Sequence, residues 1–455
     1  MISRLTVRLS GSVLLSGSVF LPLAIVLALL VLPRSLMACP FCLSPPQSFS
    51  AQLRLCDFAI VAELISMRPG DNEPRPVSHL RIRCILSGDQ KLLKACHLTT
   101  GQTIQVPSAI SGKPGELFLL YGAHGGSEAT GLARTFVKPA SSRENAGPAS
   151  PPGEWSRSPF RTVVVSNKTI LQIPDRCEWT EHQLISEQLF EYLRSLPPQT
   201  LSRQQQLAFF APYLEHSDPA IAADAWAEFA ASSWADVRST KRLLKPDQIR
   251  MWIANPQTGP ERVGLYGLML GLCGNDEDAT FLVRQMTNSA SGDFRFGGEG
   301  LLAGYLLLTG ETGLSRITPW FLSESSDDSA RYALMQCLEF LEQDEPELTL
   351  AQTRRSVIRG LAANPVLQPT AVATLARWQD WESLETVWEL YLSSLDSAQL
   401  KSSSAGFGVS GLRSIREFLR LCSQSESPQS ATAKTLLQKM KPEQDDFAED
   451  LFRQP

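Results

Sequence analysis

The amino-acid sequence predicts a two-part protein, a small closed β-barrel over residues 39–180 followed by an α-solenoid over residues 181–455. Three observations lead to this fold class. A basic and then apolar leader comes first, short strand-like runs separated by turn residues follow, and apolar residues then recur every three or four positions. With 43% apolar and 20% charged residues, the composition excludes a disordered tail, a collagen-like fibre and a multi-span membrane protein.

Residues 1–38 have the pattern of an export signal. Arg4 and Arg8 give a basic start, no further charge occurs before Arg34, and small and apolar residues lead up to Cys39. Cleavage before Cys39 would leave 39 basic against 47 acidic side chains, a formal charge of −8. This acidic balance gives no reason to expect a nucleic acid as partner.

Two other fates of the leader stay open. The uncharged run 9–33 is long enough to span a bilayer, so an uncleaved leader would be a signal anchor. Residues 36–39, Leu-Met-Ala-Cys, also resemble the lipobox of bacterial lipoproteins, in which Cys39 would be acylated. All three interpretations place the rest of the chain outside the cytoplasm, either in the periplasm or extracellular space or anchored to a membrane and facing outward.

The nine cysteines fall into an early and a late group. In an exported chain, an early group of even number indicates a disulfide framework, whose pairing the sequence does not resolve. This group consists of Cys39, Cys42, Cys56, Cys84, Cys96 and Cys177. The late group has apolar neighbours, which are typical of buried core thiols. It consists of Cys273, Cys337 and Cys422.

The Cys39-Pro-Phe-Cys42 motif admits sharper hypotheses. A thioredoxin-like redox pair needs a preceding strand, which the sequence does not offer here. Covalent haem needs His after the second Cys, where Leu43 stands. A zinc site needs a second pair of ligands, but the five His are scattered and no second C-x-x-C exists. We therefore expect disulfides at this motif, and no metal, cofactor or catalytic residue.

Five or six short strands predict the barrel. Apolar or alternating runs bounded by turn residues indicate them. They cover residues 58–65, 77–86, 102–106, 116–121, 162–165 and 169–173. The Pro-, Ser- and Gly-rich segment 139–159 predicts a long mobile loop within this domain.

Short amphipathic helices are expected from about residue 181. The first is expected to carry Leu184, Ile185, Leu189, Phe190 and Leu193. Asp218 before Pro219 predicts a capped helix start.

An internal repeat supports the solenoid. Residues 264–274 align with residues 300–310, and each copy ends in Gly and an acidic turn before a second helix. Two-helix units bury their apolar faces by stacking, so the repeat predicts an α-solenoid similar to HEAT-type repeats. An irregular helical bundle is the alternative.

Three other patterns have structural explanations. Residues 406–411 fit G-x-G-x-x-G, but no strand precedes them, so they predict a flexible loop rather than a dinucleotide site. The acidic pairs Asp327-Asp328 and Asp445-Asp446 are expected in solvated turns. Three tryptophans are expected to pack between helices. They are Trp378, Trp381 and Trp388.

Several motifs of the early part recur together in one family. They are Cys39, Cys42, Pro45-Pro46-Gln47, the run Cys56-Asp-Phe-Ala-Ile-Val-Ala-Glu, and the strands 101–106 and 115–120. In these motifs the domain, over about residues 39–178, resembles the netrin-like OB-fold modules, which include the tissue inhibitors of metalloproteinases. The order of export signal, CPFC motif, β domain and helical repeats also resembles exported proteins of planctomycete bacteria.

The resemblance implies an OB-like barrel and specific roles for its cysteines. By similarity, Cys39 and Cys42 would be tied by disulfides to later cysteines, and Cys56 to Cys177. In the inhibitors, the free amine and carbonyl of the first Cys chelate the zinc of the target protease. That role would fall on Cys39.

The functional hypothesis is a non-enzymatic binding or scaffold protein outside the cytoplasm, whose helical-repeat surface binds a protein partner. Two alternatives stay open: a metalloprotease-inhibitor-like module acting through Cys39, and a C-x-x-C thiol–disulfide redox protein. A membrane tether through the leader or a lipidated Cys39 is compatible with the first hypothesis.

Overall fold

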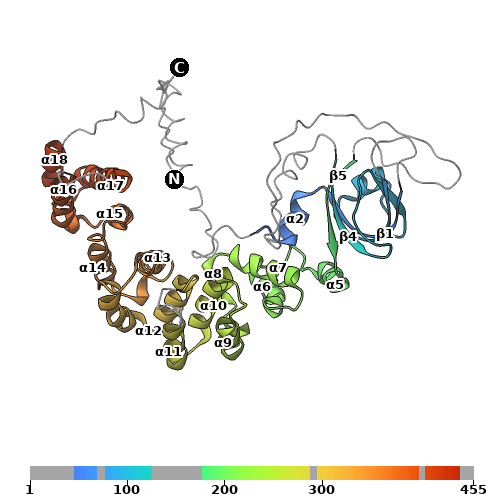
Figure 1. The fold of residues 1–455 in the computed structure, drawn as a ribbon, viewed down its shortest axis with the longest axis horizontal. Coiled ribbons are helices and arrows are strands. Elements are labelled where there is room, and N and C mark those ends of the chain that lie inside the picture. The colour runs from blue at the N-terminus through green and yellow to red at the C-terminus, as the bar shows by residue number, and fades with distance from the viewer. Residues whose placement is uncertain (1–45, 69–76, 125–176, 287–294, 399–404, 441–455) are drawn as a thin grey trace, which may run out of the picture. The chain divides into compact units, whose positions relative to one another are not determined.

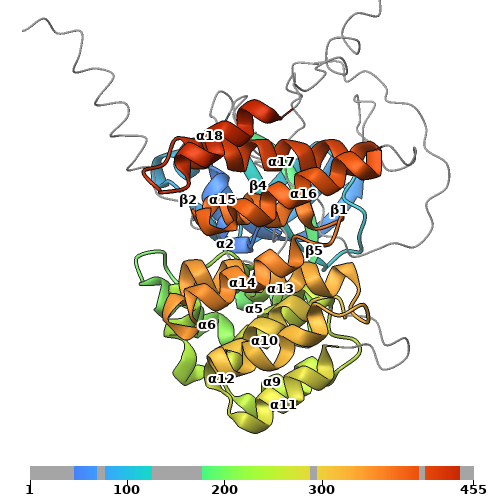
Figure 2. The same cartoon turned by 90° about the vertical axis from the view of Figure 1, so that its left-hand side faces the viewer.

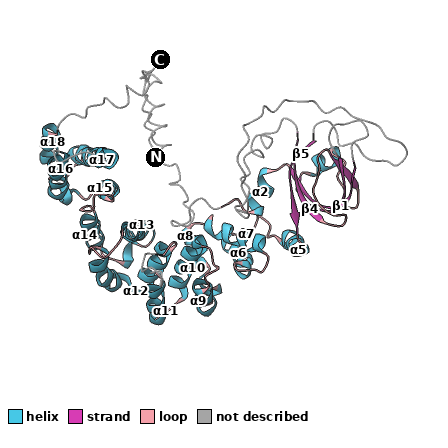
Figure 3. Ribbon diagram, in the orientation of Figure 1, coloured by secondary structure: helices cyan, strands magenta, loops and turns pink. Residues whose placement is uncertain are grey.

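The computed structural model describes residues 46–68, 77–124, 177–286, 295–398 and 405–440 (Figure 1). Within these residues, strands are confined to the first part of the chain and helices make up most of the remainder (Figure 3). The predicted order of β and then α structure is confirmed. The leader, the strands expected at 162–173, the loop 139–159 and the pair Asp445-Asp446 lie outside the described residues.

Five strands of the described chain form one antiparallel sheet in the order β3-β2-β1-β4-β5. They are β1 (Phe58–Arg68), β2 (Val77–Gly88), β3 (Thr103–Val106), β4 (Leu117–His124) and β5 (Cys177–Ile185). The first four confirm strands expected from apolar patterning. Strands β1 and β2 pair from Phe58 opposite Gly88 to Arg68 opposite Val77, with three register shifts on the way.

Strand β1 is central and is buried on both faces. Successive side chains of a strand point to opposite faces. Phe58 and Ile60 join a core that includes Leu80 of β2, whereas Ala59 and Val61 join a larger core that continues into the helices. Burial on both sides explains why this segment is almost continuously apolar. One face of the sheet therefore shares a core with the helices, and the other face has a core of its own.

The end of the sheet differs from the sequence prediction. Leu184 and Ile185, expected in the first helix, belong to β5 and pair with Phe118 and Leu117 of β4. Helix α5 (Glu187–Ser195) begins only after Ser186, whose hydroxyl accepts a hydrogen bond from the Leu189 N–H at 2.9 Å. The prediction is wrong for Leu184 and Ile185. Their distance in sequence from Leu189 and Phe190, on the other side of the cap, is the same as that between residues on one face of a helix.

Two short helices within the β part were not expected. Helix α2 (Phe49–Leu55) precedes β1, and its cap Ser48 accepts from the Ala51 N–H. Helix α3 (Gln90–Ala95) follows β2, and its cap Asp89 accepts from the N–H groups of the first turn. Both fall below the length at which apolar periodicity can be recognised.

The remaining helices follow one another with short connections. They are α6 (Arg203–Phe210), α7 (Pro219–Ala230), α8 (Trp234–Ser239), α9 (Pro246–Ala254), α10 (Pro260–Cys273), α11 (Asp276–Gln285), α12 (Gly298–Phe321), α13 (Asp328–Asp344), α14 (Ala351–Leu361), α15 (Gln368–Arg377), α16 (Leu384–Ala398), α17 (Ala405–Ser423) and α18 (Ser430–Lys439). Short 3₁₀ turns lie between them at Ala211–Tyr213, Lys241–Leu243, Pro346–Leu348 and Trp381–Ser383. As predicted, Asp218 caps α7.

The 36-residue repeat packs against itself through glycines. A Cβ added at Gly300 of α12 would lie 2.1 Å from the Gly264 carbonyl oxygen of α10, and one at Gly304 would lie 2.0 Å from the Gly267 oxygen. Any larger residue at these two α12 positions would push the backbones apart. The glycine spacing of the repeat therefore encodes a close helix–helix contact.

Each copy of the repeat ends at its glycine. Gly274 follows α10, and Asn275 then caps α11 with a capping box. In the second copy, Gly310 interrupts α12 with φ 56° and ψ −140°. This left-handed φ suits glycine. The expected two-helix unit is thus confirmed in both copies, with a kink replacing the turn in the second.

The last helices include a further difference from the sequence prediction. The segment 406–411, expected as a flexible loop, lies within α17, because that helix already begins at Ala405. Helix α17 contacts α15 and α16, and Figure 2 shows the three close together. Trp381 packs edge-on against Phe418 of α17 at 5.3 Å between ring centroids, as expected for a tryptophan between helices.

Candidate functional site

The structure describes only part of the predicted cysteine framework. Cys39 and Cys42 lie outside the described residues, and for Cys177 only the strand position is described. Cys96 is disulfide-bonded, and its partner lies outside the described side chains. Cys56 and Cys84 are free thiols, which contradicts their expected place in the disulfide framework and the Cys56–Cys177 bridge that the resemblance implies.

Strand register explains why Cys56 and Cys84 do not bridge each other. Cys84 lies opposite Val61, whereas Cys56 precedes the strand and its Sγ lies 3.7 Å from the Ser87 hydroxyl. Five residues of extended chain separate Cys56 from Val61, which corresponds to roughly 16 Å. A disulfide needs Cα atoms within about 7 Å.

The free thiols of the described chain are protected from ionisation. Burial raises the pKa of Cys56 and of Cys84, and it raises the pKa of Cys273 to about 11. Cys337 and Cys422 are fully buried, as their apolar neighbours predicted, whereas Cys273, predicted in the same way, is only partly buried. Because the thiolate is the reactive form, these five thiols have the environment of structural cysteines.

A buried polar cluster, not expected from the sequence, joins α2 to the helices. Its centre is a pair of carboxylates one turn apart on α7, Asp224 and Glu228, which are only 4% and 2% exposed. Asp224 Oδ1 accepts the backbone N–H of Phe49 at 2.5 Å, and its Oδ2 accepts the hydroxyl of Tyr192 of α5 at 2.6 Å. We call this arrangement the α7 carboxylate cluster.

Glu228 completes the cluster on its other side. Its Oε1 accepts the Ser48 hydroxyl at 2.5 Å, and its Oε2 pairs with the Arg203 guanidinium of α6 at 2.6 Å. Arg203 also donates to the Glu228 carbonyl oxygen and the Ser232 hydroxyl. Glu228 therefore has a positive partner, whereas Asp224 has only neutral donors.

This asymmetry sets the electrostatics of the cluster. Burial raises the pKa of Asp224 to about 7, and the nearby Glu228 charge adds to the rise, while the bonds from Tyr192 and the Phe49 N–H oppose it. Burial, followed by the charge of Asp224, raises the pKa of Tyr192 far above its ordinary value. Perturbed carboxyls often mark active sites. Here Ser48 and Phe49 cover the pair, so the arrangement serves attachment rather than access by a substrate.

The sequence carried a signal for this cluster that was not used. Asp224 and Glu228 are the only charges in a helix otherwise made of Pro, Ala, Ile, Trp and Phe. Two acids four residues apart on such a helix lie on the same face. Their partners Ser48 and Arg203 come from other elements, and only the fold reveals them.

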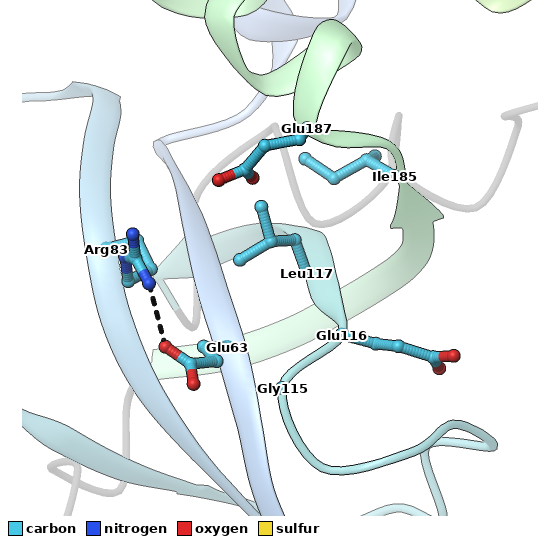
Figure 4. Close-up of a pocket in the computed structure, with 7 residues that line it drawn as sticks. All are labelled: Glu63, Arg83, Gly115, Glu116, Leu117, Ile185 and Glu187. Atoms are coloured by element: carbon cyan, nitrogen blue, oxygen red, sulfur yellow. Dashed lines mark hydrogen bonds and ion pairs between the residues drawn. The ribbon is translucent and has the colours of Figure 1, made fainter.

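A pocket of about 330 Å³ lies where β1, β2 and β4 meet the start of α5 (Figure 4). Glu63 and Arg83 form an ion pair across it at 2.9 Å. Glu187 points toward Leu117, while Glu116 points away from the other side chains, and its carboxylate accepts from the Lys113 N–H. The pocket is open and acidic, and its only cation in the described lining is already paired.

Four exposed apolar side chains lie near the ends of four successive helices, α12 to α15. They are Trp320, Leu322, Tyr332 and Val366, which are 40%, 40%, 44% and 46% exposed. Trp320 and Leu322 lie at the end of α12, Tyr332 in the first turns of α13, and Val366 between α14 and α15. We call this set the 320–366 patch.

Polar bonds join the segments that carry these four side chains. Arg331 donates to the carbonyl oxygens of Phe321 and Ser323, which fixes the end of α12 on α13. Asn364 donates to Asp328 at 2.7 Å, one turn before Tyr332 on the same face of α13.

The Leu322 side chain lies over Gly360, where an added Cβ would come within 2.9 Å of it. Asp327 is exposed in the connection before α13, as expected of a solvated turn, and it caps that helix, whereas Asp328 is the first residue of α13 and pairs with Arg331.

Comparison of the chain with protein-family models, curated proteins and solved structures finds no significant match. The resemblance to netrin-like modules therefore stays a prediction. Among the described residues, no three His, Cys, Asp or Glu side chains are grouped so that they could hold a metal. No described helix has both the length and the apolar character needed to cross a bilayer.

Proposed function

We propose that the chain is a non-enzymatic binding or scaffold protein acting outside the cytoplasm, and that its helical part binds a protein partner through the 320–366 patch. The observation that carries this proposal is that four exposed apolar side chains lie on segments that hydrogen bonds hold together. Clusters of large exposed apolar side chains are uncommon on monomeric proteins and mark interaction sites. Trp and Tyr are also the residue types most enriched among those that dominate binding energy.

The patch has the composition of a binding surface. Two aromatic and two aliphatic side chains sit on segments fixed by Arg331 and Asn364, so they lose little freedom on binding. Exposed acids, Glu324 and Asp327, lie in the connection between α12 and α13. An apolar centre with a polar rim is the usual anatomy of a protein interface.

The finer architecture belongs to the same proposal. We infer an OB-like barrel, because β3 and β5 are the two edge strands of the described sheet, and pairing of the third and fifth strands closes an OB barrel. We infer a HEAT-like solenoid from the repeat of α10–α11 by the two halves of α12. The export route, the membrane tether and the roles of Cys39 and Cys42 stay predictions from the sequence.

A comparative capture experiment tests the binding function. The full-length protein, expressed in its own host and purified from the exported fraction, would be compared with Trp320→Ser/Tyr332→Ser. The matched control is Met251→Ser/Leu350→Ser, which removes two apolar side chains that are exposed at 65% and 64% elsewhere on the helices. We expect a partner that the wild type and the control retain and the patch variant loses. Equal capture by all three proteins would overturn the proposal.

A further inference from the structure

The α7 carboxylate cluster attaches the segment before β1 to the helical part of the chain. Helix α2 has only two turns and one buried side chain, Phe49. Its start is held by the two carboxylates of α7 through the Ser48 hydroxyl and the Phe49 N–H. Further along α2, Gln52 accepts the hydroxyl of Tyr121 of β4 at 2.6 Å. A short helix with few anchors can detach without unfolding the rest of the protein.

We propose that Asp224 makes the attachment of α2 dependent on pH, with acid favouring the attached state and neutral to alkaline conditions loosening it. The inference does not rest on the proposed binding function. It rests on the geometry of the cluster, in which a carboxylate without a positive partner is sealed from water by the segment that it holds.

The hydrogen bonds allow attachment with Asp224 in either protonation state. The Phe49 N–H is an obligatory donor to Oδ1. The Tyr192 hydroxyl donates to an ionised Oδ2, but it can turn and accept from a protonated one. Attachment therefore survives protonation, and the acid form avoids the cost of burying an uncompensated charge.

The direction of the pH effect follows from this cost. Attached, Asp224 has its pKa raised by burial to about 7, whereas detachment exposes it to water and returns its pKa toward the ordinary value near 4. The attached state thus binds more protons between about pH 4 and pH 7. Attachment is strongest at the acidic end of this range and weakens as the pH rises, by up to about tenfold per pH unit.

The surrounding titratable groups do not supply the same response. On α7 and α6, Glu228 and Arg203 form their own pair at 2.6 Å. From α5 and the turn after α6, Tyr192 and Tyr213 face the site, with ring centroids 4.9 Å apart. His216 lies beyond them against the Tyr213 ring at 5.8 Å, so it does not touch Asp224.

Hydrogen–deuterium exchange of the full-length protein between pH 5 and pH 8 tests the proposal. The measured quantity is the protection factor of the α2 amides, whose intrinsic exchange rate is divided out at each pH. We expect protection to fall toward pH 7 by up to about tenfold per unit and then level off. Amides of α10, which lies in the shared core, serve as the internal reference.

Two variants identify the group responsible. Asp224→Asn keeps an acceptor for the Phe49 N–H and cannot ionise, so its α2 protection should not change with pH. Asp218→Asn is the matched control on the same helix, because Asn also caps helices, and it should behave as the wild type. His216 is present in both variants. A wild-type profile without slope, or a slope that persists in Asp224→Asn, would overturn the proposal.

A third variant keeps the test decisive if Asp224→Asn does not fold. Tyr192→Phe removes a hydrogen bond that favours the ionised carboxylate. The pH at which protection levels off should then move upward from about 7. A profile identical to that of the wild type would show that Asp224 does not control the attachment.

Discussion

Buried charges in this protein are held by several partners each, and Arg354 of α14 shows the pattern most fully. The side chain is 2% exposed. It pairs with Glu342 of α13 at 2.6 Å and donates to Thr349 and to the Pro346 carbonyl oxygen. One guanidinium thus ties the connection between α13 and α14 to both helices. Such a group fixes a conformation because leaving its partners unpaired is costly.

Replacing Arg354 by Met should destabilise the protein by about 3 kcal/mol, because the Glu342 carboxylate and three acceptor oxygens of Pro346 and Thr349 would lose their buried donor. The measurement is the free energy of unfolding from urea titration. The control is Arg194→Met, which removes an exposed pair with Glu191 and should change stability by less than about 0.5 kcal/mol. Equal effects of the two substitutions would show that Arg354 does not hold this connection.

At the residue scale, the sequence could predict the burial of a side chain from its neighbours, but not the residues with which it pairs. The apolar neighbours of Cys337 and Cys422 predicted buried thiols correctly. The even number of early cysteines did not show that Cys56 and Cys84 stay free, because pairing depends on strand register. Asp224 and Glu228 were overlooked, since the donors that satisfy them come from α2, α5 and α6.

At the scale of elements, the periodic recurrence of apolar residues predicted strands and helices wherever polar residues or glycines did not interrupt it. Strands β1 to β4 follow directly from their apolar runs. Strand β5 was missed because the residues Cys177 to Gln183 are mostly polar, and its last two residues have helical spacing with Leu189. The segment 406–411 has the glycines of a loop, but it is helical because α17 packs against α15 and α16, and packing overrides the low helix propensity of glycine.

The glycine contact between α10 and α12 gives the sharpest test at this scale. Gly304→Ala should destabilise the protein by about 1–3 kcal/mol, because its Cβ would lie 2.0 Å from the Gly267 carbonyl oxygen. Gly264→Ala is the matched control on α10. Its Cβ would lie 3.6 Å from the nearest atom, and Ala favours the helix, so stability should be unchanged or higher. Thermal and urea unfolding would measure both, and a tolerated Gly304→Ala would contradict the contact.

At the scale of the whole molecule, one face of the sheet shares its core with the helices, while the other face has a core of its own. Ala59 and Val61 of β1 belong to the same core as Trp226 of α7 and Leu265 of α10. The spacing of apolar residues distinguishes the β part from the helical part, because spacing reflects local structure. The sequence could not show the core that the two parts share, because that core depends on tertiary packing.

The cysteine states make a prediction for the complete exported protein. Alkylation after denaturation without reductant should label the five free thiols of the described residues and leave Cys96 unlabelled. The five are Cys56, Cys84, Cys273, Cys337 and Cys422. Peptide mass spectrometry would measure the labelling and also identify the amino terminus and any acyl group on Cys39. Labelling of Cys96 before reduction would contradict the disulfide.

The most direct test of the central claim, that the helical surface binds a protein partner, is site-specific photo-crosslinking at Tyr332. A photoreactive phenylalanine analogue preserves an aromatic side chain at this position, which is 44% exposed. In the native host, we predict one discrete crosslinked partner from Tyr332, and none from the same analogue at Phe296, an aromatic that is 85% exposed in the turn before α12. The absence of a crosslink at Tyr332, or the same products from both positions, would contradict a binding function for the 320–366 patch.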